Sequence, residues 1–223
     1  MDFLQGEILY FDKPLHWTSF DLVSKIRYQI CRSLQINKIK VGHVGTLDPL
    51  ATGVMIICTG KATKKIESLQ NQKKEYVATI RLGATTPSFD LETEIDKTFE
   101  TGHITKELIE QTLQQFVGTF EQTPPAFSAC RFAGYRAYKL ARKGIEVKLD
   151  PRMITIDEIE LLSFHEDVLT IRVVCGKGTY IRALARDIGS ALNSGAHLIA
   201  LQRTRLGDVT LDKCLSVDEF CKT

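Results

Sequence analysis

The stretch of the sequence that could carry chemistry is "VGHVGTLDPLATG", residues 41–53, where one aspartate stands among three glycines. A carboxylate can act as a nucleophile or stabilise a developing charge, and glycines let the backbone approach a ligand closely. Pro49 fixes its own φ and keeps Asp48 out of the helical conformation, so the acid is presented on a stiff turn. The apolar run "VMIIC" that follows predicts a buried strand. We therefore expect an acid displayed at the edge of a sheet.

Three interpretations of this stretch compete on its own residues. The Asp-Pro pair is typical of a turn in which the aspartate bonds its own backbone. A phosphate-binding loop would need G-x-x-x-x-G-K-[ST], but Gly60-Lys61 is followed by Ala62, and Met55 stands where the first glycine is required. The third interpretation is an aspartate used as a nucleophile or charge stabiliser. The choice among them depends on the rest of the chain.

Length and composition favour one domain. The chain has 223 residues, 43% of them hydrophobic, which suffices for an ample core. It has no internal repeat and no linker-like tract, so we expect a single catalytic domain over residues 1–223 with a short tail from about residue 213. No apolar stretch reaches membrane-spanning length and the start lacks the features of a signal peptide, which predicts a cytoplasmic protein. The six cysteines form no C-x-x-C pair, so neither a disulfide framework nor a zinc site is expected.

Charge is distributed unevenly although the net charge is only +2. Residues 131–152 carry seven arginines and lysines against two acids, and residues 61–74 carry five lysines against one acid. Such segregation could form a basic face that follows a phosphate backbone. For either cluster alone, charged residues that merely solvate a helix face explain the pattern equally well.

The elements that must position Asp48 follow from periodicity. "EILYF" predicts a first strand, and Thr18 or Ser19 can cap a helix in which Leu22, Ile26 and Ile30 recur at helical spacing. Further strands are predicted at "EYVATIRL" and "HLIALQRTRLG", and "MITIDEIELLSF" with "VLTIRVVC" suggests a hairpin across "HED". Helices are predicted after Thr105, from Leu108 to Val117, and from Ile181 to Ile188. The order predicts an α+β fold with a mixed, largely antiparallel sheet flanked by helices.

Four further motifs accompany the Asp48 loop: "KKEYVATIRLG", "PPAFSACRFAGYRAYKLAR", "GTYIRALARDIG" and "LQRTRLG". Together with "GHVGTLDPLATG" and in this order, they resemble the bacterial tRNA pseudouridine synthases of the TruB type, whose relatives include the archaeal and eukaryotic box H/ACA enzyme. The resemblance runs from about Glu7 to Asp212. Five ordered motifs are far more specific than one, which favours a functional role for Asp48 over the turn alone.

The resemblance implies an isomerase that converts uridine to pseudouridine in RNA, at position 55 in the T-loop of tRNA. The uracil is detached from its ribose, turned and rejoined through C5, with no cofactor and no metal. The implied partner is the T-arm of tRNA, with no membrane, no obligate protein partner and a monomeric enzyme. Many bacterial relatives continue into a small RNA-binding PUA domain, whereas this chain stops at Thr223, so we expect the catalytic domain without a PUA domain.

The resemblance also implies catalytic residues. Asp48 matches the family's aspartate, which either attacks the nucleotide covalently or stabilises charge at the sugar, and the sequence does not choose between these routes. Arg182 matches the arginine that pairs with this aspartate, which fits the cost of an unpaired buried carboxylate. Tyr76 matches the tyrosine that stacks on the everted target base and can accept a proton.

Other positions match the family's substrate-binding set. Tyr180 and Leu201 correspond to residues that line the uracil pocket, and His43 to a histidine that holds the RNA loop rather than transferring protons. Lys13 and Pro14 resemble the family's "KP" turn, which supports the catalytic loop. The sequence departs from the family at His16-Trp17, where glycine is usual, and this leaves the geometry of that turn open.

Two functions outside the isomerase class are alternatives. An RNA-binding or tRNA-folding module could keep the fold without the chemistry, but it has no need of Asp48, Tyr76 and Arg182 together. A hydrolase with an aspartyl nucleophile is disfavoured because Asp48 is followed by Pro49-Leu50 rather than by the D-x-D pattern. Asp90 lies where the family also carries an acid, and the sequence assigns it no role.

Overall fold

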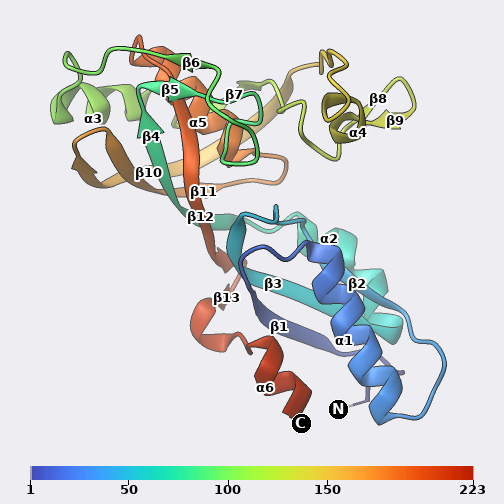
Figure 1. Cartoon of the computed structure of the whole chain (residues 1–223). Coiled ribbons are helices and arrows are strands. Elements are labelled where there is room, and N and C mark those ends of the chain that lie inside the picture. Colours follow the sequence, from blue (N-terminus) through green and yellow to red (C-terminus); the bar gives the residue numbers. More distant parts are fainter. Residues whose placement is uncertain (1, 223) are drawn as a thin grey trace. The chain divides into compact units, whose positions relative to one another are not determined.

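Figure 1 shows the structure as a computed structural model, which describes residues 2–222. The chain packs as two compact units: residues up to Tyr76 together with those from Leu201 onward, and Val77–Ala200. Strands β4 (Lys74–Leu82) and β12 (Ala196–Leu206) each run through both units. A single catalytic domain over residues 1–223 stays a prediction.

The first unit is built around β3 (Ala51–Thr59), the strand that follows the Asp48 loop. β1 (Ile8–Lys13) and β2 (Val41–Val44) both pair with β3 in antiparallel register. The last part of β12 pairs with β3 in parallel, from Leu201 opposite Ala51 to Arg203 opposite Gly53. β13 (Val209–Thr210) then pairs back onto β12. The parallel pairing makes the sheet mixed, as the sequence predicted.

Helix α1 (Ser19–Ser33) lies against this sheet (Figure 1) and begins where the sequence predicted. Thr18 is its N-cap and forms a capping box with Asp21. Its inward side chains are fully buried and include the predicted Leu22, Ile26 and Ile30. The lysine-rich segment after β3 forms a 3₁₀ turn, η1 (Gly60–Lys65), before the α-helix α2 (Ile66–Gln70) begins.

The predicted C-terminal tail is in fact structured up to residue 222. It contains a 3₁₀ turn, η2 (Leu211–Lys213), and helix α6 (Val217–Lys222). The ring of Phe220 is 6% exposed and packs edge-on against Phe11, with 5.3 Å between ring centroids. Burial of this aromatic ring anchors the segment to β1, a contact between distant residues that no local pattern indicated.

The second unit contains strands in the order β12-β4-β11-β10-β7. β10 (Arg152–His165) and β11 (Val168–Cys175) form the predicted hairpin, and β7 (Gly118–Gln122) pairs antiparallel with β10. Two short ribbons complete the unit: β5 (Ala84–Thr85) with β6 (Lys97–Thr98), and β8 (Arg131–Phe132) with β9 (Tyr135–Arg136).

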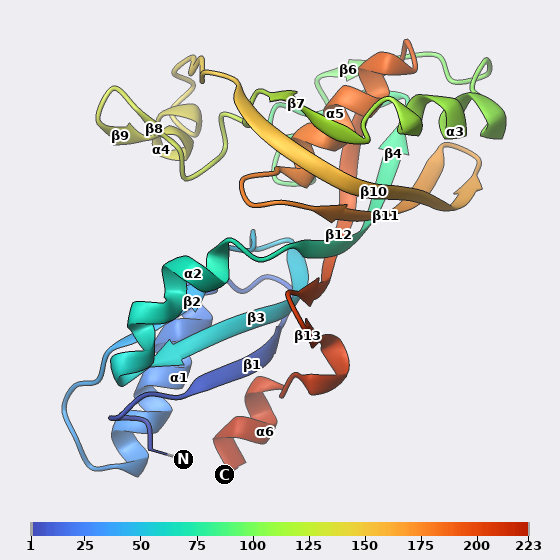
Figure 2. The same cartoon turned by 180° about the vertical axis from the view of Figure 1, so that it is seen from behind.

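Helices α3 (Lys106–Gln114) and α5 (Ile181–Ala191) lie on the same side of these strands (Figure 2). Thr105 caps α3 as predicted, but the helix ends before Phe116 and Val117, and Val117 is exposed. α5 buries its predicted inward residues, Ile181, Leu184, Ala185 and Ile188. The short α4 (Ala137–Ala141) follows the β8-β9 ribbon. The α+β class, with a mostly antiparallel mixed sheet flanked by helices, is confirmed. Among residues 2–222, no helix is long and apolar enough to cross a membrane.

Candidate active site

Asp48 begins a tight turn that leads directly into β3. The amide of Ala51 donates to the carbonyl of Asp48 at 3.0 Å, and Pro49 occupies the position of the turn that its fixed φ favours. The Asp-Pro turn considered for this sequence therefore exists. Asp48 itself is half-buried, so the residue stays partly accessible to solvent.

Two residues of the preceding segment hold this turn from its flanks. The hydroxyl of Ser19 donates to the carbonyl of Leu47 and accepts from its amide, both at 2.9 Å. The amide of His16 donates to the carbonyl of Pro49 at 2.8 Å. Ser19 is 3% exposed, so these bonds form where water does not compete well. The backbone on both sides of Asp48 is therefore fixed.

His16 occupies a turn position at which the family usually carries glycine. Its φ is +66°, a left-handed conformation that glycine adopts at little cost and other residues adopt rarely. The turn keeps the geometry that glycine would favour although histidine occupies it. Its contact with Pro49 shows what that geometry achieves.

Arg203 on β12 is the largest fully buried side chain of the described residues, at 1% exposed. Its Nε donates to the carbonyl of Val54 at 2.7 Å and its Nη2 to the carbonyl of Gly45 at 3.1 Å. One guanidinium thus connects the start of the Asp48 loop to the strand that follows it. Gly53 allows the strands to approach, because a Cβ there would lie 2.2 Å from the carbonyl oxygen of Arg203.

Lys13 and Pro14 lie in a turn that hydrogen bonds hold together, and their support of the Asp48 loop stays a prediction. The side chain of Lys13 is fully buried, and its Nζ donates to the carbonyls of Pro14 at 2.9 Å and Trp17 at 2.6 Å. Burial lowers the pKa of Lys13 to about 8, while the negative charge of Asp48 opposes this shift and the positive charge of Arg203 adds to it. Lys13 is therefore close enough to Asp48 for the two charges to interact.

His43 lies on β2, opposite Ile57 of β3, and is half-buried. Its Nδ1 is buried and has no hydrogen-bond partner among residues 2–222. Burial lowers the pKa of His43, and the positive charge of Arg203 lowers it further. The imidazole is therefore neutral at neutral pH, and its role in holding RNA stays a prediction.

Tyr76 and Leu201 also belong to the first unit. Tyr76 on β4 is 8% exposed and shares a face of the strand with Lys74 and Ala78. Leu201 on β12 is half-buried and pairs with Ala51, the residue that closes the Asp48 turn. The first unit thus carries Lys13, Pro14, His43, Asp48, Tyr76 and Leu201.

Arg182 lies in the first turn of α5 in the second unit and is 4% exposed. Its Nη1 donates to the carbonyl of Ser88 at 3.1 Å and its Nη2 to that of Phe127 at 2.9 Å. Its Nε lies 3.5 Å from Oδ2 of Asp90. Arg182 is therefore a buried guanidinium held in a fixed orientation, and its predicted pairing with Asp48 of the first unit stays a prediction.

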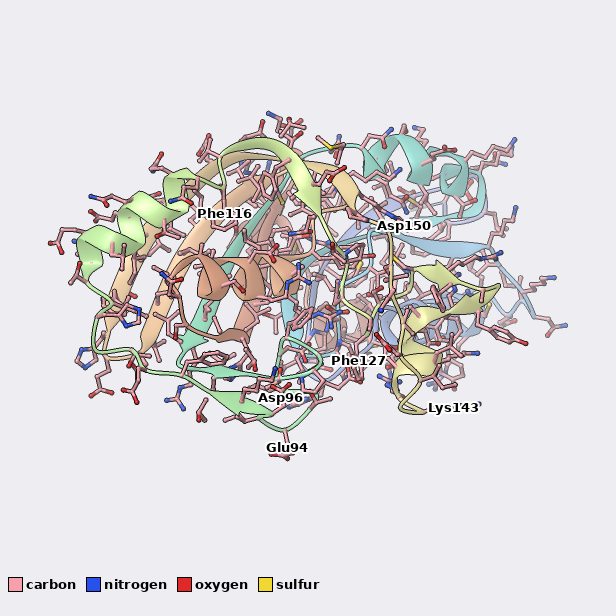
Figure 3. All side chains as sticks on the ribbon, turned by 90° about the horizontal axis from the view of Figure 1, so that it is seen from above. Glu94, Asp96, Phe116, Phe127, Lys143 and Asp150 are labelled. Atoms are coloured by element: carbon pink, nitrogen blue, oxygen red, sulfur yellow. The ribbon has the colours of Figure 1, made fainter. Side chains whose placement is uncertain are left out.

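Asp90, to which the sequence assigned no role, is a partner of Arg182. It is 4% exposed, and its Oδ1 accepts from the amide of Glu92 at 2.9 Å. The loop that carries it continues to Glu94 and Asp96, and Figure 3 shows Glu94 directed outward, away from α5. Phe127, whose carbonyl Arg182 contacts, precedes the basic segment that contains Lys143 and Asp150 (Figure 3).

Tyr180 is the N-cap residue of α5 and is held at both its backbone and its side chain. Gln122 accepts from the amide of Tyr180 at 2.9 Å and donates to its carbonyl at 3.2 Å. The phenol oxygen lies 3.2 Å from Sγ of Cys130. Burial raises the pKa of Tyr180 to about 12, and the contact with Cys130 adds to the shift. The phenol is therefore neutral and can act as a hydrogen-bonding group.

Sequence reasoning missed Ser19, Arg203 and Gln122 as site residues. Each lies inside a motif that the sequence displayed: the helix start after Trp17, "LQRTRLG" and "EQTPP". Their partners are backbone groups distant in sequence, so no local pattern indicated them. Among residues 2–222, no group of three or more histidines, cysteines or acidic residues could hold a metal ion.

Comparisons with known proteins cover nearly the whole chain. The TruB family pseudouridylate synthase N-terminal domain matches residues 32–181, and the tRNA pseudouridylate synthase B C-terminal domain matches residues 182–222. Relatives named tRNA pseudouridine synthase B are 68% identical in Phocaeicola vulgatus and 66% in Parabacteroides distasonis. Each of these two alignments covers 99% of this chain and 94% of the relative.

Solved structures are similar to this chain over nearly its full length. The chain is similar to a subunit of a Cbf5-Nop10-Gar1 complex, with a TM-score of 0.72 and 29% identity. It is also similar to a chain of an H/ACA RNP bound to a substrate RNA containing 2'-deoxyuridine, with a TM-score of 0.70 and 28% identity. In both, 99% of this chain aligns with 54% of the other, so this chain spans about half the length of those solved chains. The chain belongs to the TruB family of pseudouridine synthases.

Proposed function

We propose that the protein is a tRNA pseudouridine synthase that isomerises uridine 55 in the T-loop of tRNA. The observation that carries the proposal is a match of 64–68% identity to relatives named tRNA pseudouridine synthase B over nearly their whole length. The Asp48 loop supports it, because Ser19, His16 and Arg203 hold the backbone around this acid in one geometry. Fixed placement of a reacting group is a main source of catalytic rate.

In the proposed reaction, the target uridine leaves the folded loop before its glycosidic bond can be reached. The ring of Tyr76 would stack on the everted base and offset part of the lost stacking, roughly 1–3 kcal/mol per base. Leu201 and Tyr180 would line the uracil pocket. His43, with its pKa lowered, would hold the RNA loop as a neutral ring.

Asp48 would act on the ribose as an ionised carboxylate. Two chemical routes use it: attack on the nucleotide to form a covalent intermediate, or stabilisation of charge at the sugar while uracil departs. In either route Arg182 is the proposed counter-charge, and Asp90 would orient it. After uracil turns, C5 bonds to C1′ and the proton leaves C5, with Tyr76 as the candidate acceptor.

The basic segments 61–74 and 131–152 are proposed to contact the phosphates of the T-arm. The shape of the folded loop and the base that can be everted would supply specificity, as is usual for RNA loops. We propose that the enzyme works as a monomer without a protein partner. Because its substrate is tRNA, we expect it to act in the cytoplasm.

An unmodified tRNA transcript tests the proposal. The protein alone, without added cofactor or metal, should convert uridine 55 to pseudouridine, mapped by base-specific chemistry. An isolated T-arm hairpin should also be modified, and a transcript with cytidine at position 55 should not. Binding of the transcript without any pseudouridine would favour the RNA-binding alternative and contradict the proposal.

A further inference from the structure

The turn that supplies two partners to Arg182 contains a strained residue. Phe89 has a φ of +63°, in the left-handed region that non-glycine residues rarely adopt. Its neighbours on either side are Ser88, whose carbonyl accepts from Arg182, and Asp90, whose carboxylate pairs with it. The conformation of Phe89 therefore decides where both of these partners lie.

Such a conformation persists only where the surroundings fix it. The backbone of Phe89 is tied at both ends: its amide donates to the carbonyl of Thr86 at 3.1 Å, and its carbonyl accepts from the amide of Leu198 at 2.9 Å. The side chain is held by Arg186. The guanidinium carbon of Arg186 lies 4.9 Å from the centre of the Phe89 ring, within the range of a cation–π contact.

Arg186 is one helical turn beyond Arg182 in α5, so the two side chains lie on the same face. Both arginines contact the same two segments, the turn at Ser88–Phe89 and the stretch from Thr123 to Phe127. Arg182 contacts Ser88 and Phe127, while Arg186 contacts Phe89 and donates from Nη2 to the carbonyl of Thr123 at 3.2 Å. Asp187 orients Arg186 by accepting from its Nε at 2.7 Å.

We infer that Arg186 is a positioning residue, which holds the left-handed turn at Phe89 and thereby orients Arg182 for the reaction; its catalytic part rests on the proposed function. Arg186 contacts Phe89 and Thr123 rather than Ser88, Asp90 or Phe127, so we place its effect on Arg182 through Phe89. Its planar guanidinium is needed, because only that group stacks on a ring while it also donates sideways to a carbonyl.

Three variants test the inference. Arg186→Met keeps the aliphatic stem and removes the contacts with Phe89, Thr123 and Asp187, whereas Arg186→Lys keeps the charge but loses the planar group. Phe89→Leu removes the aromatic face from the other side, and it serves if Arg186→Met folds poorly. We expect kcat to fall roughly 10- to 100-fold in Arg186→Met and less in Arg186→Lys, with tRNA binding changed by less than about three-fold.

A double-variant cycle separates positioning from general packing. If Arg186 works by placing Asp90, then Arg186→Met should cost little more kcat in an Asp90→Asn background. The matched control is Arg172→Met, since Arg172 has 29% of its side chain exposed against 24% for Arg186 and pairs with Glu158 and Glu160. Its kcat should stay at the wild-type value.

A second readout does not depend on the reaction. The NMR signal of the Arg182 Nε–H should shift in Arg186→Met and Phe89→Leu but not in Arg172→Met. An unmoved signal, an unchanged kcat, or losses that multiply with Asp90→Asn would overturn the inference. If the wild-type protein makes no pseudouridine, the proposed function fails, while the Arg182 signal still decides whether Arg186 positions that residue.

Discussion

Arg203 donates to the carbonyl of Gly45, three residues before Asp48, with 3.1 Å between Nη2 and the oxygen. The same guanidinium donates to Val54 at the far side of the loop. Because Gly45 and Val54 flank the Asp48 turn, one buried side chain on β12 fixes both of its ends. The position of the carboxylate therefore depends on a strand that lies about 150 residues away along the chain.

Replacement of Arg203 by methionine should lower both stability and activity. Two carbonyls lose a buried donor, which we expect to lower the free energy of unfolding by roughly 2 kcal/mol, and the loosened loop should lower kcat at least about ten-fold. Urea unfolding and turnover of a tRNA transcript measure the two effects. Arg205→Met, at a partly exposed arginine of the same strand that pairs with Glu75, is the control and should lower stability by less than about 1 kcal/mol.

Gly53 should not tolerate alanine. Its φ is +106°, and a Cβ would meet the backbone of Arg203, so the β3–β12 pairing has to open beside the Asp48 loop. We expect Gly53→Ala to lose roughly 3 kcal/mol or more of unfolding free energy. Gly118 separates the two causes, because its φ is +113° and a Cβ there meets nothing within 4 Å. If Gly118→Ala is as destabilising as Gly53→Ala, backbone strain alone explains the loss and the close approach to Arg203 is irrelevant.

Gln122 should affect stability and turnover through its hydrogen bonds to Tyr180. Gln122→Met keeps the volume but removes both hydrogen bonds to the Tyr180 backbone, which loosens the start of α5. We predict a free energy of unfolding lower by about 1–2 kcal/mol and a lower kcat for uridine conversion. Gln114→Met, at an exposed position of α3, should change neither quantity. Equal activity of the two variants would show that the placement of Tyr180 does not limit turnover.

Lys13 should make the free energy of unfolding depend on pH in the alkaline range. Its pKa of about 8 in the folded protein lies below the ordinary value of 10.5, so between these values the unfolded chain binds more protons than the folded one. Stability should therefore rise with pH across this window relative to Lys13→Met, because the cost of burying the charge disappears. Urea unfolding of both proteins on either side of pH 8 measures the difference. A difference that stays constant, or falls as pH rises, would contradict the lowered pKa.

Local patterns predicted the elements well, and tertiary contacts account for what they missed. The Thr18 cap with Leu22, Ile26 and Ile30 predicted α1, and the alternating strands predicted the β10–β11 hairpin, because such signals depend on near neighbours. Nothing local indicated that Arg203 would be buried or that β12 would pair in parallel with β3. The role of Asp90 was equally hidden, since its partner Arg182 is distant in sequence.

The candidate site residues come from the family motifs rather than from periodicity, and their roles stay predictions. The structure places Lys13 within electrostatic reach of Asp48, and Leu201 opposite Ala51 at the end of the same turn. Gln122 and Ser19 were missed because their hydrogen bonds go to backbone groups, which leave no pattern in the sequence. Their side chains specify position rather than chemistry.

The central claim is that the carboxylate of Asp48 takes part in the reaction, and one substitution tests it most directly. Asp48→Asn keeps the shape and the Asp-Pro turn but removes the negative charge. With an unmodified tRNA transcript, we predict that pseudouridine at position 55 falls below detection while tRNA binding stays within about three-fold of wild type, because binding depends mainly on phosphate contacts. The exposed Asp212→Asn is the control and should turn over normally. Turnover by Asp48→Asn within about ten-fold of wild type, a difference of about 1.4 kcal/mol, would contradict the assignment of this carboxylate.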